Sequence, residues 1–293
     1  MSVTGSPPDS WQKTRRRLQR RDSREKLRRL IRRPLTILAI IALGVLGLAV
    51  GITAGLKSEG STSQCQRAFI PAYFPADVWS QAAGTKPPPS AMILNPATGV
   101  GAGRAPDAGF QAAAGQARDA GSVVLGYSST ADGLRPIGQV EADVRNYKAW
   151  YGVTGIFLDS VNGVSSNFHY YEQLTSYIRK IIPGASIWLN PGIYPDQQYM
   201  SLANVMVVFE GTYAQYRAEQ VPAWANNYPA TRFANTVYAA FTSAQANSAI
   251  SLSRSRNTGY LYVTNLLGAN PYNALPSYWS TELAALATGC GQS

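Results

Sequence analysis

Two short apolar segments of the chain each end in a carboxylate. The first runs Gly-Ile-Phe-Leu-Asp and ends at Asp159, and the second runs Val-Met-Val-Val-Phe-Glu and ends at Glu210. Segments of this length that are rich in β-branched and aromatic residues are typical of buried strands, so both acids are predicted at strand tips. A cleft with two carboxyls can hydrolyse a glycosidic bond: one protonates the leaving oxygen, and the other acts as nucleophile or as base for water. A helix cap or an arginine partner is the structural alternative for either acid alone.

Aromatic and amide side chains are predicted at or just beyond the ends of other strands. The tyrosines and phenylalanines of this kind are Tyr73, Phe74, Tyr127, Tyr194, Tyr213, Tyr238 and Tyr272. Their rings could stack on sugar faces, although packing under the loops is the alternative for each. Asn95 and Asn190 each precede a proline at a predicted strand end, where an amide suits hydroxyl recognition.

The order of elements predicts how these residues are positioned. Eight apolar runs follow Cys65, at 67–74, 91–95, 122–128, 154–159, 185–190, 204–210, 233–241 and 258–265. Stretches with helical spacing separate them, so the strands are expected to be parallel and to close as a (β/α)8 barrel over residues 65–293. An open doubly wound sheet is the main rival, but the glycine-rich run 99–103 lacks the G-x-G-x-x-G spacing that would support it.

The first 64 residues differ from the rest. Residues 1–34 hold twelve Lys and Arg against three acids, which is +9 of the net charge of +10. Residues 35–56 carry no charge and would form about 33 Å of helix, enough to cross a bilayer. The sequence therefore predicts a basic cytoplasmic tail, a transmembrane signal-anchor, a linker over 57–64 and an extracytoplasmic barrel. A cleaved signal peptide is the alternative.

The composition also limits the chemistry. The predicted barrel carries only +1, so a nucleic-acid surface is not expected on it. With one histidine, His169, and two cysteines, common zinc sites are not predicted, and no cofactor is implied. No G-x-S-x-G motif accompanies His169 to suggest a Ser-His-Asp triad. Cys65 and Cys290 bracket the predicted barrel and are expected to form a disulfide outside the cytoplasm, two unpaired thiols being the alternative.

Several motifs together resemble the spherulation-specific family 4 (spherulin-4) proteins. In chain order they are Ile-Pro-Ala-Tyr-Phe-Pro at 70–75, Ile-Leu-Asn-Pro at 93–96, Val-Leu-Gly-Tyr at 124–127, Trp-Tyr at 150–151, Gly-Ile-Phe-Leu-Asp at 155–159, Asn-Pro-Gly at 190–192, Phe-Glu at 209–210 and Tyr-Val-Thr at 262–264. The resemblance extends from Arg67 to about Trp279.

This resemblance implies a (β/α)8 fold and, through characterised fungal members, an endo-α-1,4-galactosaminidase activity on a galactosamine-containing exopolysaccharide. It also implies an Asp-Glu pair on the fourth strand and a Glu on the sixth. Asp159 and Glu210 match, whereas Ser160 stands in place of the second acid. We therefore expect a membrane-anchored hydrolase of an amino-sugar polysaccharide, with Asp159 and Glu210 catalytic and their individual roles unassigned. The expected substrate contacts are Tyr73, Asn95, Tyr127, Ser160, Asn190, Tyr194, Tyr213 and Tyr238. A non-catalytic glycan-binding barrel, favoured by Ser160, and a structural envelope protein are the alternatives.

Overall fold

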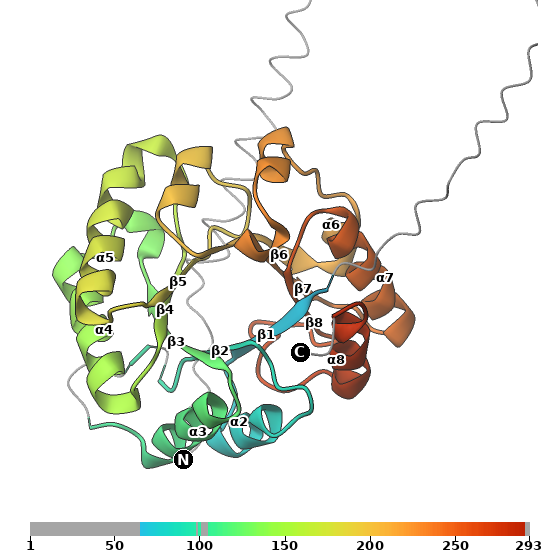
Figure 1. The fold of residues 1–293 in the computed structure, drawn as a ribbon, viewed down its shortest axis with the longest axis horizontal. Coiled ribbons are helices and arrows are strands. Elements are labelled where there is room, and N and C mark those ends of the chain that lie inside the picture. Colours follow the sequence, from blue (N-terminus) through green and yellow to red (C-terminus); the bar gives the residue numbers. More distant parts are fainter. Residues whose placement is uncertain (1–64, 98, 101–104, 291–293) are drawn as a thin grey trace, which may run out of the picture. The chain divides into compact units, whose positions relative to one another are not determined.

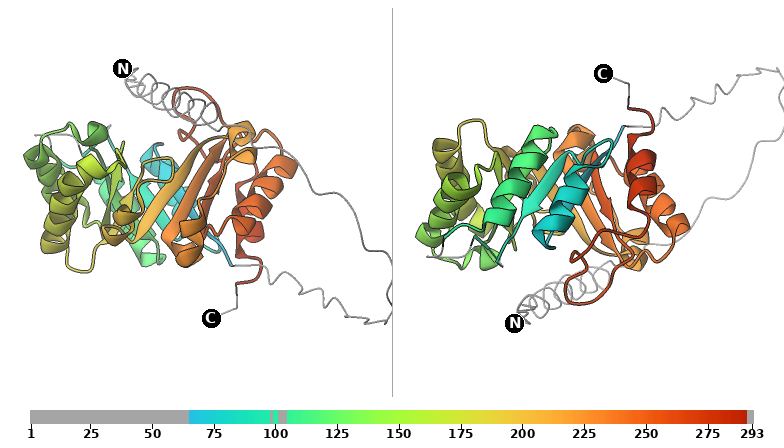
Figure 2. Two further views of the ribbon diagram at one scale, coloured as in Figure 1. Left: turned by 90° about the horizontal axis from the view of Figure 1, so that it is seen from above. Right: turned by 90° about the horizontal axis from the view of Figure 1, so that it is seen from below.

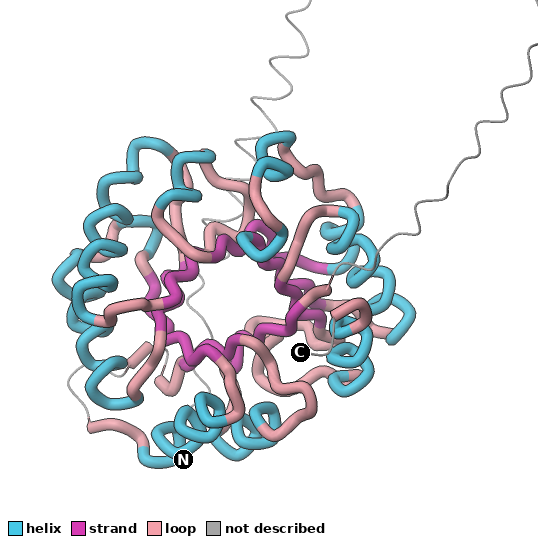
Figure 3. Tube along the Cα trace, viewed as in Figure 1, coloured by secondary structure: helices cyan, strands magenta, loops and turns pink. Residues whose placement is uncertain are grey.

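Eight parallel strands form a closed barrel in sequence order (Figures 1 and 3). The computed structural model describes residues 65–97, 99–100 and 105–290. The strands are β1 (Arg67–Ala72), β2 (Ala91–Leu94), β3 (Val123–Ser129), β4 (Gly155–Asp159), β5 (Ser186–Leu189), β6 (Val205–Thr212), β7 (Phe233–Tyr238) and β8 (Tyr260–Val263). Each coincides with one of the eight apolar runs, so the predicted barrel is confirmed.

Helices surround the strands on the outside of the barrel (Figures 1 and 2). They are α2 (Ala76–Ala83), α3 (Ala108–Asp119), α4 (Ile137–Tyr151), α5 (Phe168–Ile181), α6 (Tyr213–Arg217), α7 (Ser243–Ser255) and α8 (Trp279–Ala287). The prediction of a helix after every strand was wrong for β5, which is followed only by a 3₁₀ turn at Gln197–Ser201. Pro191 and Pro195 lie in this connection and disfavour a continuous helix.

The barrel interior is a packed core of aromatic side chains. The ring centroids of Phe69 on β1 and Trp188 on β5 lie 5.3 Å apart, although these strands are on opposite sides of the barrel. Trp188 also contacts Tyr260 of β8, at 4.9 Å. On the outer side, the Tyr147 ring of α4 lies 2.5 Å from where a Cβ of Gly126 would stand, so this β3 position requires glycine. The interior is therefore filled, and open space for a ligand is left to the loops at the ends of the strands.

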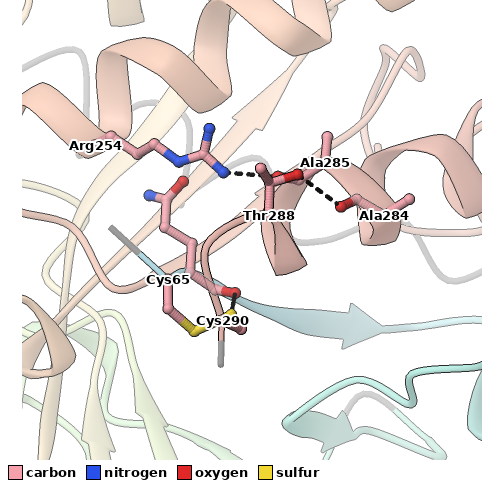
Figure 4. Close-up of a disulfide and its surroundings, with 7 residues drawn as sticks. Cys65, Arg254, Ala284, Ala285, Thr288 and Cys290 are labelled. Atoms are coloured by element: carbon pink, nitrogen blue, oxygen red, sulfur yellow. Dashed lines mark hydrogen bonds between the residues drawn. A yellow bond between two sulfur atoms is a disulfide. The ribbon is translucent and has the colours of Figure 1, made fainter. Parts of the chain in front are cut away.

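A disulfide between Cys65 and Cys290 joins the two ends of the barrel chain, as predicted (Figure 4). The Cα atoms lie 4.5 Å apart. Beside it, the Gln66 side chain donates to Ser253 Oγ at 2.6 Å and to the Thr258 carbonyl at 2.7 Å. Because Cys65 precedes β1, this cross-link lies at the N-terminal face of the barrel.

The predicted tail, membrane span and linker lie outside the described residues. Within the part of the chain that the structure describes, no helix is both long enough and apolar enough to cross a membrane.

Replacing both cysteines with serine should lower the free energy of unfolding by up to about 5 kcal/mol, because the disulfide closes a very long loop in the unfolded chain. Urea unfolding of the wild type and the Cys65→Ser/Cys290→Ser variant would measure the difference. Reductant should bring the wild type to the midpoint of the variant and leave the variant unchanged. Equal midpoints for the oxidised wild type and the variant would contradict this expectation.

Candidate active site

Asp159 and Glu210 lie side by side at the C-terminal mouth of the barrel, bridged by one amide. The Asn190 Nδ2 atom donates to Asp159 Oδ1 and to Glu210 Oε2, both at 2.8 Å. The two hydrogens of an amide nitrogen diverge by about 120°, so these carboxylate oxygens are on the order of 5 Å apart. All three side chains are at least nine-tenths buried, with exposures of 8%, 8% and 7% for Asp159, Glu210 and Asn190. The two acids therefore form one pair in a single environment.

The end of β4 is fixed by the loop that follows β3. The carbonyl of Asp159 accepts from the Thr130 backbone N–H at 2.9 Å. The next residue, Ser160, has a φ of 53° and a carbonyl that accepts from the Asp132 N–H at 2.8 Å and from Thr130 Oγ1 at 2.7 Å. A left-handed conformation is costly for serine and persists only where surrounding bonds impose it. These bonds turn the chain sharply after Asp159 and fix its side chain at the mouth.

A bulge in β6 turns Glu210 toward the interior. Val205 is in register with Trp188, whose ring crosses the barrel, so strict alternation would direct Val205, Val207 and Phe209 inward and Glu210 outward. The register with β7 shifts between Val207 and Phe209. Phe209 consequently packs outside, 4.8 Å from the ring of Tyr216 on α6, and Glu210 faces Asn190. One inserted residue thus re-aims the carboxylate, a use of bulges that recurs beside active sites.

Three tyrosines surround the carboxylate pair. The Tyr127 hydroxyl donates to Asp159 Oδ2 at 2.8 Å, and the Tyr272 hydroxyl donates to Glu210 Oε1 at 3.1 Å. Tyr73 lies between them, with ring centroids 5.6 Å from Tyr127 and 5.8 Å from Tyr272. Burial, followed by the nearby charge of Asp159, raises the pKa values of Tyr73 and Tyr127 well above the ordinary value. Both phenols therefore stay protonated, and Tyr127 can donate to Asp159.

Burial, followed by the nearby charge of Glu210, raises the pKa of Asp159 to about 6. Hydrogen bonds from Tyr127 and Asn190 oppose this rise because they stabilise the ionised form. Two carboxyls this close titrate as a coupled pair, so the proton belongs to the pair. Below about pH 6 the pair therefore retains a proton.

The structure brings some of the other predicted contacts to the pair but not all. Ser160 Oγ lies 3.4 Å from Asp159 Oδ2. Tyr238 ends β7 and lies two residues beyond Thr236, which is in register with Glu210. Tyr213 begins α6, directly after β6. Both tyrosines are partly exposed at the mouth.

Asn95 and Tyr194 have other partners. The Asn95 side chain accepts from the Gly99 N–H within its own loop. The Tyr194 ring packs against Trp224 and Phe233, at 5.7 and 6.2 Å. The structure therefore does not bring Tyr194 to the carboxylates.

Tyr272 was not among the expected substrate contacts, although its ring was predicted near a strand end. It lies in the long loop 264–278 between β8 and α8, far from β6 in sequence. The feature of the sequence that could have indicated a role for Tyr272 is the composition of this loop, which holds three asparagines, two tyrosines and no charged residue. His169, in contrast, lies on α5 with its side chain 75% exposed and 3.2 Å from Glu172, away from the pair.

The sequence matches a known family over most of the barrel. The model of the spherulation-specific family 4 matches residues 68–286. The chain belongs to this family. Spherulin-4 of Physarum polycephalum is 29% identical over 239 residues, which cover 77% of this chain and 71% of that protein.

Two solved structures share the barrel fold. Sph3 of Aspergillus clavatus, determined in complex with GalNAc, has a TM-score of 0.66 and 22% identity, covering 77% of this chain and 99% of that one. A chitinase from Chromobacterium violaceum has a TM-score of 0.50 and 11% identity, covering 78% of this chain and 100% of that one. At these identities the similarity supports the fold.

The raised pKa of Asp159 should make the folded protein less stable as pH rises. The folded state binds the proton of Asp159 more tightly than the unfolded state does. The stabilisation that this proton gives to the fold is therefore complete below about pH 4 and is lost as the pH rises through about 6. Asp159→Asn removes the ionisable group and with it this loss of stability at high pH. The variant should therefore have a free energy of unfolding about 1 to 3 kcal/mol higher than that of the wild type at pH 7, with a smaller gain at pH 4.

Denaturant unfolding at both pH values would measure this effect. Asp196→Asn is the matched control, because Asp196 is an exposed aspartate in a neighbouring loop. A gain for Asp159→Asn that is the same at both pH values would contradict the expectation.

Proposed function

We propose that this protein is a glycoside hydrolase that acts through Asp159 and Glu210 on an amino-sugar polysaccharide. The observation that carries the proposal is the pair of buried carboxyls, bridged by Asn190 at the barrel mouth, one of which holds a proton up to about pH 6. Unequal protonation of two carboxyls in one cleft is what acid-assisted glycoside cleavage requires.

In the proposed mechanism the two acids have different roles. Asp159, with its raised pKa, is the general acid that protonates the leaving glycosidic oxygen as the bond from C1 to that oxygen breaks. Glu210 supplies the carboxylate that bonds to C1. A water molecule then attacks C1, gives its proton to Asp159 and releases Glu210. The separation on the order of 5 Å favours this retaining route over the inverting one, which needs room for a water between the acids.

Asn190 has a second function in this scheme. Its two N–H groups hold the carboxylates, and its Oδ1 atom is buried without a hydrogen-bond partner among the described residues. A buried acceptor left unpaired is costly, and a hydroxyl or amide N–H of a bound sugar would satisfy it. Tyr73, Tyr213 and Tyr238 offer rings and hydroxyls around the same mouth.

The amino-sugar substrate is supported by the family and by its relatives. Sph3, which shares the barrel fold over 77% of this chain, was determined with GalNAc bound. A galactosamine-containing polymer is therefore the first substrate to test. Ser160 departs from the Asp-Glu pair that the resemblance implied, yet Asp159 already has its partner acid in Glu210. The left-handed φ of 53° at Ser160 also disfavours a larger side chain there.

We further propose that the barrel works outside the cytoplasm, held by residues 35–56. The disulfide supports an oxidising compartment. The described part of the chain enters the barrel at Cys65, before β1, on the face opposite the carboxylates. The basic residues before the anchor set the orientation.

The full chain should release oligosaccharides from a polymer of galactosamine or N-acetylgalactosamine. Asp159→Asn and Glu210→Gln should each reduce the rate at least about 100-fold, because each removes an ionisable group at nearly constant volume. Glycan binding should survive both changes. Binding without turnover by the wild type would favour the glycan-binding alternative that Ser160 suggests, and activity indifferent to both variants would exclude this site.

The first product released should keep the anomeric configuration of the cleaved bond. ¹H NMR recorded during the first minutes of hydrolysis distinguishes the two anomers before they interconvert. Inversion would show that Glu210 acts as a base for water rather than as the nucleophile.

A further inference from the structure

We propose that Tyr272 is a positioning residue that makes the ionisation and orientation of Glu210 depend on the loop between β8 and α8. The proposal rests on the function given above and deepens it, because it assigns a role to a loop outside the strands that carry the acids. The Tyr272 hydroxyl donates to Glu210 Oε1 at 3.1 Å, and the residue is 6% exposed.

The loop 264–278 is built to hold Tyr272 in place. Its two ends are joined by a bond from the Ser277 N–H to Asn265 Oδ1 at 2.8 Å. Within the loop, Asn270 Oδ1 accepts from the N–H of Tyr272 itself at 3.0 Å. The Tyr262 ring of β8 lies beneath, 6.2 Å from the Tyr272 ring. Two asparagine side chains therefore fix the backbone from which the phenol reaches across to β6.

The two acids of the pair are supported in different ways. Asp159 receives its phenol from Tyr127, which is part of β3 and in register with Phe157 of β4. Glu210 receives its phenol from Tyr272, which belongs to no strand and lies in the loop beyond the residues bonded to the end of β7. A change in the loop should therefore affect Glu210 while leaving Asp159 in place.

Groups from β1, β3, β4 and β5 lie around Glu210, and among them Tyr127 of β3 is close enough for the charge of Glu210 to help raise its pKa. Asp159 from β4 is the charged neighbour, Asn190 from β5 is a neutral donor, and Tyr73 after β1 lies between the phenols. The loop 264–278 itself carries no charged residue. The hydrogen bond from Tyr272 is a contact through which the loop can influence this carboxylate. A hydrogen bond to a carboxylate favours its ionised form, so losing the bond raises the pH at which the group ionises.

The pH profile of kcat/KM for the full chain tests the proposal. In the proposed mechanism, the acidic limb reports the first ionisation of the coupled pair, which supplies the carboxylate of Glu210, and the basic limb reports the second, which removes the proton of Asp159. Tyr272→Phe should move the acidic limb up by about half a unit to one unit, and Tyr127→Phe should instead move the basic limb up. Tyr170→Phe is the matched control, because Tyr170 lies on α5, outside this loop, and its hydroxyl donates to the Arg135 carbonyl at 2.7 Å. It should leave both limbs in place.

A second variant tests the role of the loop. Asn265→Ala removes the bond that joins the loop ends without touching either acid, and it should shift the acidic limb in the same direction as Tyr272→Phe. The double variant should shift it no further than the larger single change, since both act through one hydrogen bond. Additive shifts, or an unmoved acidic limb in Tyr272→Phe, would overturn the proposal.

A titration without substrate separates this proposal from the proposed function. ¹³C NMR of the glutamate side-chain carboxyl carbons follows Glu210 in the unliganded protein, with Glu210→Gln identifying its signal. The Glu210 signal should titrate at higher pH in Tyr272→Phe than in the wild type and be unchanged in Tyr170→Phe. This result would support the positioning role even if no polymer were hydrolysed. Identical titration in the wild type and Tyr272→Phe would refute it even in an active enzyme.

Discussion

The bridge from one amide nitrogen to two buried carboxyls is the interaction on which the site depends. Asn190 sets the separation of Asp159 and Glu210, because a single NH₂ group serves both acids at 2.8 Å. Two negative charges at this distance and burial would be strongly unfavourable, and the pair responds by retaining a proton. The retained proton lowers the repulsion between the two buried carboxylates, and the same proton makes one of the acids a proton donor.

Local departures from regular structure bring these residues together. A bulge in β6 turns Glu210 inward, and a left-handed Ser160 ends β4 directly after Asp159. Among the described residues, five non-glycine residues have positive φ, and four of them lie just after β3, β4 or β7 at the mouth: Ala131, Asp132, Ser160 and Ala239. Backbone strain is thus concentrated at the site, while the regular strands and the disulfide at the opposite face supply the stability that tolerates it.

The sequence was sufficient for the fold and for the central acids. Each strand is a short apolar run between polar segments, a signal that depends only on neighbouring residues, and Asp159 ends its run without irregularity. Glu210 was found for a reason that was incomplete, since plain alternation along β6 directs it outward and only the bulge corrects this. The bulge depends on pairing with β7, which residues within β6 do not encode.

Tyr194 and Tyr272 show the same limit for the loops. Both follow strands, yet the connection after β5 has no helix, and Tyr194 packs into the aromatic cluster with Trp224 and Phe233. Tyr272 reaches Glu210 across 62 positions in the chain, through a loop folded by its own asparagines. Loop side chains are placed by such long-range and loop-internal bonds, so strand periodicity cannot locate them. The barrel therefore fixes where a site can form, and its loops determine which donors complete it.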